Sequence, residues 1–256
     1  MVQLDNGLDE QGHIRNIYSP SHIQTDFNSV VGAAIGELTA TLPDQIDGIY
    51  LYGSIGRGNA VIGQSDLDLS IVLKHPQSEA QRQTFKEIAR DFPRRHPQIS
   101  KIDLDIGHVD EVLQAGEYYR WQFWLKHCCC CVWGNDLSTR FEWHKPSHNI
   151  ALAINGDLIE FTEQMLPKLL TGSEYGIEKV IGKKLLRTAY YFVAERDPSW
   201  YTNLEQCFEA CIRHYPNHIE ELEKIYQVAT GDLIAPKDAL YLFEGFSQFL
   251  NHKWII

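Results

Sequence analysis

The sequence has no long apolar run and no cysteine spacing typical of a disulfide framework. No segment approaches the about eighteen consecutive apolar residues of a membrane span. Residues 1–16 are polar and acidic, without the basic start and apolar core of a secretory signal. Four of the six cysteines are consecutive, and neighbouring cysteines are poorly placed to bridge one another. These absences argue against a membrane protein and a secreted scaffold, and we expect a cytoplasmic protein.

Basic residues are also in short supply. The chain has 23 Lys and Arg against 34 Asp and Glu, a formal net charge of −11. A surface that holds a nucleic-acid backbone usually carries a basic stripe, so a nucleic-acid partner is not expected. The acidic balance suits a cationic small molecule better. No pattern in the sequence indicates an oligomeric state.

The periodicity of apolar residues predicts an α/β part over residues 1–145 and an all-α part over residues 146–256. In the first part we expect strands over 47–53, 67–73 and 99–109, an extended run over 128–134, and helices over 21–42, 78–92 and 117–127. In the second part strand signals vanish, and amphipathic helices are expected over 149–170, 176–195, 203–214, 218–229 and 237–252.

The stretch "LYGSIGRGNAVIGQSDLDLSIVL" over residues 51–73 places a glycine-rich turn between two predicted strands. Gly53 and Ser54 follow the first strand directly, where a glycine lets the backbone approach a phosphate and a hydroxyl adds a donor. Asp66 and Asp68 are two residues apart, so their side chains share one face of the second strand. Converging carboxylates repel one another unless a divalent cation lies between them.

A third carboxylate is available on another predicted strand. The sequence "ISKIDLDIGHV" alternates apolar and acidic residues, so Asp103 and Asp105 share a face. Either one would complete a site of three carboxylates with Asp66 and Asp68. Such a site is suited to in-line displacement at phosphorus assisted by two metal ions.

Gly-Ser, a short variable segment, Asp-x-Asp on a strand and a later Asp on another strand together resemble the DNA polymerase β-like nucleotidyltransferase superfamily. The segment "GSIGRGNAVIGQSDLDL" is similar to its small-molecule and minimal bacterial branch, which includes aminoglycoside adenylyltransferases and nucleotidyltransferase antitoxins. The resemblance covers residues 21–140 and implies an α+β nucleotidyltransferase fold with a short mixed sheet. It implies phosphate binding at Gly53 and Ser54, and magnesium ligands at Asp66 and Asp68. The motif "KIDLD" favours Asp103 as the third ligand. A shift of one residue in the alignment would select Asp105 instead.

The function predicted on this basis is transfer of a nucleoside monophosphate, AMP from ATP, to an acceptor hydroxyl with two Mg²⁺ ions. Asp66 and Asp68 would hold both ions, and the third carboxylate would hold one and help deprotonate the hydroxyl. The acceptor would be an aminoglycoside-like small molecule or a protein. The alternative is an antitoxin or regulatory partner-binding protein, whose nucleotidyltransferase fold either modifies a toxin or is non-catalytic.

Three further residues are candidates for nucleotide binding. Arg57 and Ser65 both precede Asp66 in the quoted stretch, and a surface salt bridge is the alternative role for Arg57. Lys183 belongs to a basic stripe with Lys179 and Arg187, for which a solvated helix face is the alternative.

Other residues that invite a functional interpretation are expected to be structural. The cysteine run 128–131 follows His127 but lacks a Cys-x-x-Cys pair, so we expect buried small apolar side chains rather than a metal site. Cys207 and Cys211 fall on the apolar stripe of a predicted helix, which places them in a core. His144 and His148 lie near the predicted domain junction.

Overall fold

The computed structural model describes residues 5–171 and 176–254, which form two compact units. The first, here called the sheet unit, comprises residues 16–143. The second, the helical unit, comprises residues from 144 onward together with the N-terminal stretch up to residue 15. None of the described helices is both long enough and apolar enough to cross a membrane.

The N-terminal stretch joins the helical unit through its backbone. The amide of Ile14 donates to the carbonyl of His144 at 2.9 Å, and the amide of Trp200 donates to the carbonyl of Asn6 at 2.7 Å. Such bonds connect residues far apart in the sequence. The periodicity of apolar residues carries no information about such bonds. For this reason the predicted division at residue 145 assigned the N-terminal stretch to the α/β part.

The sheet unit is built on a short mixed sheet of four strands in the order β3-β2-β1-β4. Strand β1 is antiparallel to both β2 and β4, whereas β2 and β3 are parallel. A parallel pair needs a crossover connection, which helix α3 provides. The strands are β1 (Ile46–Tyr52), β2 (Leu67–Leu73), β3 (Ile102–His108) and β4 (Cys130–Gly134). A mixed sheet with helices, followed by a helical part, confirms the predicted fold class.

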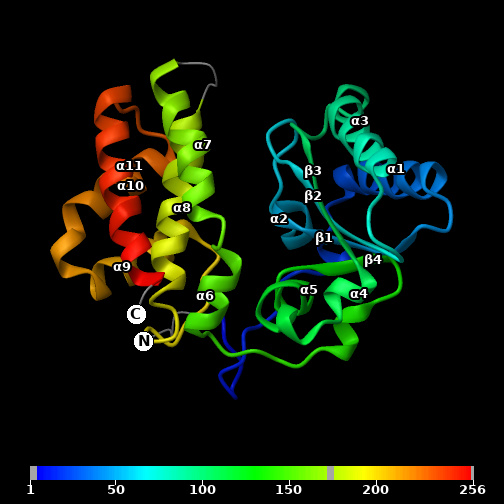
Figure 1. Ribbon diagram of the computed structural model, residues 1–256, viewed down its shortest axis with the longest axis horizontal. Helices are drawn as coiled ribbons and strands as arrows, with labels where there is room; N and C mark the ends of the chain where they lie inside the picture. The colour runs from blue at the N-terminus through cyan, green and yellow to red at the C-terminus, as the bar shows by residue number, and fades with distance from the viewer. Residues whose placement is uncertain (1–4, 172–175, 255–256) are drawn as a thin grey trace. The chain divides into compact units, whose positions relative to one another are not determined.

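The two faces of the sheet are covered unequally. Helices α1 (Thr25–Thr41) and α3 (Glu79–Arg95) pack on one face, where they bury the apolar side chains of all four strands (Figure 1). Helices α4 (Val109–Val112) and α5 (Phe123–His127) cover part of the other face, over Tyr50 and Val72. Asp68 and Asp103, at the beginning of β2 and β3, are only half-buried. The partly covered face therefore leaves polar side chains accessible at one end.

Three predicted helices of the sheet unit differ from those observed. The helix predicted over 21–42 begins at Thr25, after a turn of 3₁₀-helix at Pro20–His22. Helix α3 continues beyond the predicted end, through Pro93 to Arg95. The segment predicted as one helix over 117–127 begins with a turn of 3₁₀-helix and a π-helix, Tyr118–Gln122, before α5. The one-turn helix α2 (Gly53–Arg57) follows β1 without an intervening loop.

In the helical unit, α8 lies against five other described helices, α6, α7, α9, α10 and α11. A Cβ at Gly182 of α8 would lie 3.3 Å from backbone atoms of α10, so the glycine permits the close approach of these two helices. The helices of this unit are α6 (His148–Ile154), α7 (Leu158–Thr171), α8 (Ile177–Tyr191), α9 (Leu204–His214), α10 (Ile219–Thr230) and α11 (Pro236–Asn251).

The helix predicted over 149–170 is broken into α6 and α7 at Asn155-Gly156-Asp157. The buried Asn155 side chain donates to the carbonyl of Ala151 and accepts a hydrogen bond from Thr188 of α8 at 2.8 Å. An asparagine with satisfied side-chain partners favours a turn over a continuing helix. The break is therefore held by a tertiary contact with α8.

Five of the six cysteines are buried, as predicted, whereas Cys131 is only half-buried. Cys128, Cys129 and Cys130 are buried, and burial raises the pKa of the Cys128 thiol to about 12. Cys207 and Cys211 are buried in α9. All six cysteines are free thiols.

Candidate active site

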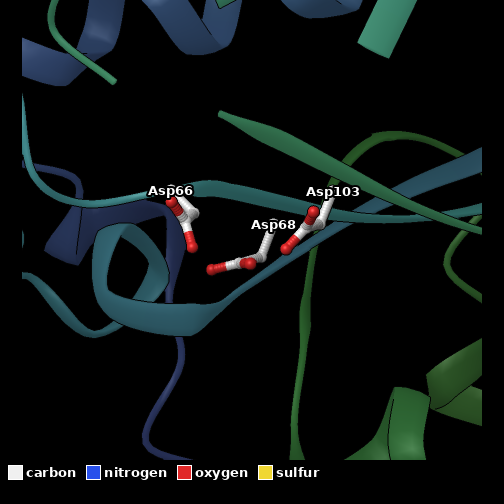
Figure 2. Close-up of side chains that lie close together, drawn as sticks. All are labelled: Asp66, Asp68 and Asp103. Carbon is white, nitrogen blue, oxygen red and sulfur yellow. The ribbon is translucent and has the colours of Figure 1, made fainter. Parts of the chain in front are cut away.

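Three carboxylates meet at the accessible end of the sheet. Asp66 lies just before β2, Asp68 is in β2, and Asp103 of β3 is the direct register partner of Asp68. Each offers one oxygen, and these three oxygens all lie within 4.8 Å of one another. Figure 2 shows the side chains turned toward a common space, with Asp68 between the other two. We call Asp66, Asp68 and Asp103 the carboxylate triad.

Asp105 lies two register pairs further along β3, on the same face as Asp103, and pairs with Ser70 of β2. Its carboxylate accepts a hydrogen bond of 2.7 Å from the hydroxyl of Tyr52 in β1. Tyr52 in turn packs edge-on against Trp124 of α5, with ring centroids 5.1 Å apart. Asp105 is thus engaged by an aromatic side chain and lies outside the triad.

Burial and neighbouring like charges alter the acid-base behaviour of Asp68. Burial is the largest cause that raises the pKa of Asp68 to about 7, and the neighbouring charges of Asp103 and Asp66 add to it. At neutral pH a carboxyl group with this pKa is about half ionised, and a positive charge nearby favours the ionised form.

Lys101 supplies such a charge. Its ammonium lies 2.6 Å from Oδ2 of Asp103 and 3.4 Å from Oδ2 of Asp66. Partial desolvation lowers the pKa of Lys101, but the hydrogen bond to Asp103 and the charges of both carboxylates raise it overall. Ser100 adds a hydroxyl that donates to Asp66. Two side chains therefore place a cation and a hydroxyl donor against the triad.

The glycine-rich turn packs directly on the triad. Gly53 has a φ of 70°, a left-handed conformation, and a Cβ at this position would overlap the Asp68 carboxylate. The single turn of α2 begins at Gly53, and the adjacent Ser54 is its second residue. A hydroxyl and backbone amides thus lie beside the carboxylates.

Replacement of Gly53 by alanine is expected to destabilise the sheet unit by about 3 kcal/mol, because alanine is strained at this φ and its methyl group displaces Asp68. Thermal unfolding of the variant measures the effect. The matched control is Gly32→Ala, since Gly32 is exposed within α1 and has open space around its Cβ position. That change is expected to be neutral or to stabilise by up to about 1 kcal/mol. Equal stability of the two variants would contradict the described packing.

The other predicted binding residues occupy different surroundings. Arg57 donates to the hydroxyl of Tyr18 at 3.0 Å and lies over its ring, a contact that neither sequence interpretation anticipated. The Ser65 hydroxyl accepts from the amide of Val61 and so shapes the turn that precedes Asp66. Lys183 lies in α8 of the helical unit.

Sequence reasoning missed Lys101 and Tyr52 at this site. Lys101 is two residues before Asp103, and the two-residue period of a strand would have placed both on one face. The contact of Tyr52 with Asp105 spans 53 positions and has no local signal. His144 is buried in the helical unit, and the ring of His148 lies 5.6 Å from that of Phe192.

The mixed sheet, the glycine turn and the carboxylate triad together form the candidate active site of the sheet unit. Residues 37–159 match the family model described as "Nucleotidyltransferase domain", which confirms the resemblance seen in the sequence. Among solved structures, the chain is similar to spectinomycin adenyltransferase AAD(9) from Enterococcus faecialis, determined with ATP and spectinomycin. The two are 14% identical with a TM-score of 0.59, over 87% of this chain and 98% of that one, a likeness that establishes a shared fold. No curated protein matches the sequence.

Proposed function

We propose that this protein transfers a nucleoside monophosphate, AMP from ATP, to a hydroxyl group of a cationic small molecule. The observation that carries the proposal is the convergence of Asp66, Asp68 and Asp103 beside the turn that begins at Gly53. The fold shared with an adenyltransferase determined with ATP and spectinomycin supports this choice of substrates. The net charge of −11 is consistent with a cationic acceptor.

The triad has the donor set that magnesium requires. Its ligands would be carboxylate oxygens, the hard donors that Mg²⁺ prefers. The raised pKa of Asp68 and the ammonium of Lys101 both indicate that the cluster needs a compensating cation. In this proposal Asp66 and Asp68 hold two ions and Asp103 holds one of them. Bound magnesium supplies neutralisation of the triphosphate charge and activation of the attacking hydroxyl.

The side chains of the sheet unit have distinct parts in the proposed reaction. The hydroxyl of Ser54 and the amides of α2 bind phosphate oxygens, as donors at a helix start do. Asp103 accepts the proton of the acceptor hydroxyl. The acceptor oxygen then forms a bond to the α-phosphorus, the bond from that phosphorus to the α,β-bridging oxygen breaks, and pyrophosphate leaves. Arg57 and Lys183 remain proposed nucleotide-binding residues.

A transfer assay tests the proposal. The protein is incubated with Mg²⁺, each α-labelled nucleoside triphosphate in turn, and panels of aminoglycosides, spectinomycin and candidate proteins. Label from ATP is expected on a small cationic acceptor, with loss of the signal in Asp66→Asn and no loss in Asp91→Asn, a surface control on α3. Label on a protein alone would support the toxin-modifying alternative, and an unchanged rate in Asp66→Asn would contradict the metal assignment.

Metal binding is expected to depend on pH through Asp68. A proton and a divalent cation compete for the same carboxylate, and the pKa of Asp68 in the metal-free protein is about 7. The ionised fraction falls about tenfold from pH 8 to pH 6, so the affinity for Mn²⁺, used as a probe for Mg²⁺, should fall by about that factor. Mn²⁺ titration followed by electron paramagnetic resonance measures it. An affinity that rises or stays constant toward pH 6 would contradict the protonation of Asp68.

A further inference from the structure

Lys101 connects the two ends of the triad. Its ammonium contacts Oδ2 of both Asp103 and Asp66, although these residues belong to different segments of the sheet unit. The backbone is fixed at this point, since the carbonyl of Lys101 accepts from the amide of Leu67 at 2.9 Å. The side chain is 56% exposed, so it can move without any change in the backbone. The ammonium of Lys101 thus contacts oxygens of the proposed metal ligands, while its backbone is held in place and its side chain is free to move.

We propose that Lys101 is the counter-cation of the metal-free site and that a divalent cation displaces it. This inference rests on the proposed function. The ammonium and the metal ion require the same carboxylate oxygens, and two cations at such short range repel each other. Lys101 therefore weakens binding of a metal ion that arrives alone.

The displaced ammonium needs a new partner, and the nucleotide provides one. Gly53 packs against Asp68, so a triphosphate bound at the turn places its negative charge beside the triad. A lysine side chain is flexible and binds phosphate as a point charge. Lys101 thereby couples the two ligands, because metal binding becomes favourable when the triphosphate is present to accept the ammonium.

The coupling is tested by Mn²⁺ binding to the full-length protein, measured by electron paramagnetic resonance at pH 8 with and without a non-hydrolysable ATP analogue. Lys101→Met is expected to bind Mn²⁺ alone about tenfold more tightly than the wild type, because the competing cation is gone. The gain in Mn²⁺ affinity on adding the analogue should be smaller in this variant than in the wild type. Lys101→Arg, which keeps the charge, should restore both wild-type values.

Lys74→Met is the matched control, since Lys74 is exposed and follows the opposite end of β2. It removes the same charge from the same unit and should bind Mn²⁺ as the wild type does. Equal or weaker binding of Mn²⁺ alone by Lys101→Met would overturn the inference and leave the proposed function standing. Absence of saturable Mn²⁺ binding to the wild type, with the analogue present, would overturn the proposed function itself. Thermal unfolding of each variant verifies that it is folded.

Discussion

Replacement of Asp68 by asparagine is expected to reduce the transfer rate at least about a thousandfold, or about 4 kcal/mol of transition-state stabilisation, while it stabilises the metal-free fold. The first effect follows because the amide removes a charged ligand from the triad. The second follows because an ionised Asp68 is unfavourable where burial and two neighbouring carboxylates raise its pKa to about 7. The transfer assay and thermal unfolding at pH 8 measure the two effects.

The stabilisation has a defined dependence on pH. In the unfolded chain Asp68 ionises near its ordinary pKa of 3.8, whereas in the folded protein it retains a proton up to about 7. The contribution of Asp68 to the free energy of unfolding of the wild type is therefore fully present below pH 3.8 and is lost as the pH rises through about 7. At pH 8 the variant should gain roughly 1–2 kcal/mol, a value reduced for partial exposure, and the gain should vanish toward pH 4. A variant that is less stable than the wild type at pH 8 would contradict this electrostatic strain.

Two neighbouring substitutions on β3 are expected to differ by at least an order of magnitude in transfer rate. Asp103→Asn removes a member of the triad and should reduce the rate at least about a hundredfold. Asp105→Asn keeps an oxygen that can accept the hydrogen bond from Tyr52 and should reduce the rate less than about tenfold. Steady-state rates under saturating ATP and acceptor measure the difference.

This pair provides its own control, because both changes remove one negative charge from the same strand. Thermal unfolding of the two variants excludes loss of folded protein as the cause. A larger loss in Asp105→Asn than in Asp103→Asn would assign the third carboxylate to Asp105 and contradict the triad.

Local patterns were sufficient to predict the strands and to place Asp68, Asp103 and Asp105 on them, with Asp66 just before β2. A two-residue period determines that Asp66 shares a face with Asp68, and Asp103 with Asp105, whatever the rest of the chain does. The choice between Asp103 and Asp105 depends instead on the register of β2 against β3, which pairs Asp68 with Asp103. Register is a property of two segments together, and no pattern within either one contains it.

The other differences between the predicted and the observed structure also arise from contacts between segments far apart in the sequence. The division of the predicted helix 149–170 depends on a contact between Asn155 and Thr188 of another helix. The association of residues 5–15 with the helical unit depends on backbone bonds to residues far along the chain. The role of Lys101 as a counter-charge became visible only with the distances from its ammonium to two carboxylates.

The most direct test of the central claim is the position of the metal. Crystals grown with Mn²⁺ and a non-hydrolysable ATP analogue give an anomalous signal that locates the ion independently of any assumed site. The triad predicts at least one peak within roughly 2.5 Å of oxygens from Asp66, Asp68 and Asp103, with the triphosphate beside the turn at Gly53. A peak bound by other side chains, or nucleotide bound without metal at these three carboxylates, would contradict the claim.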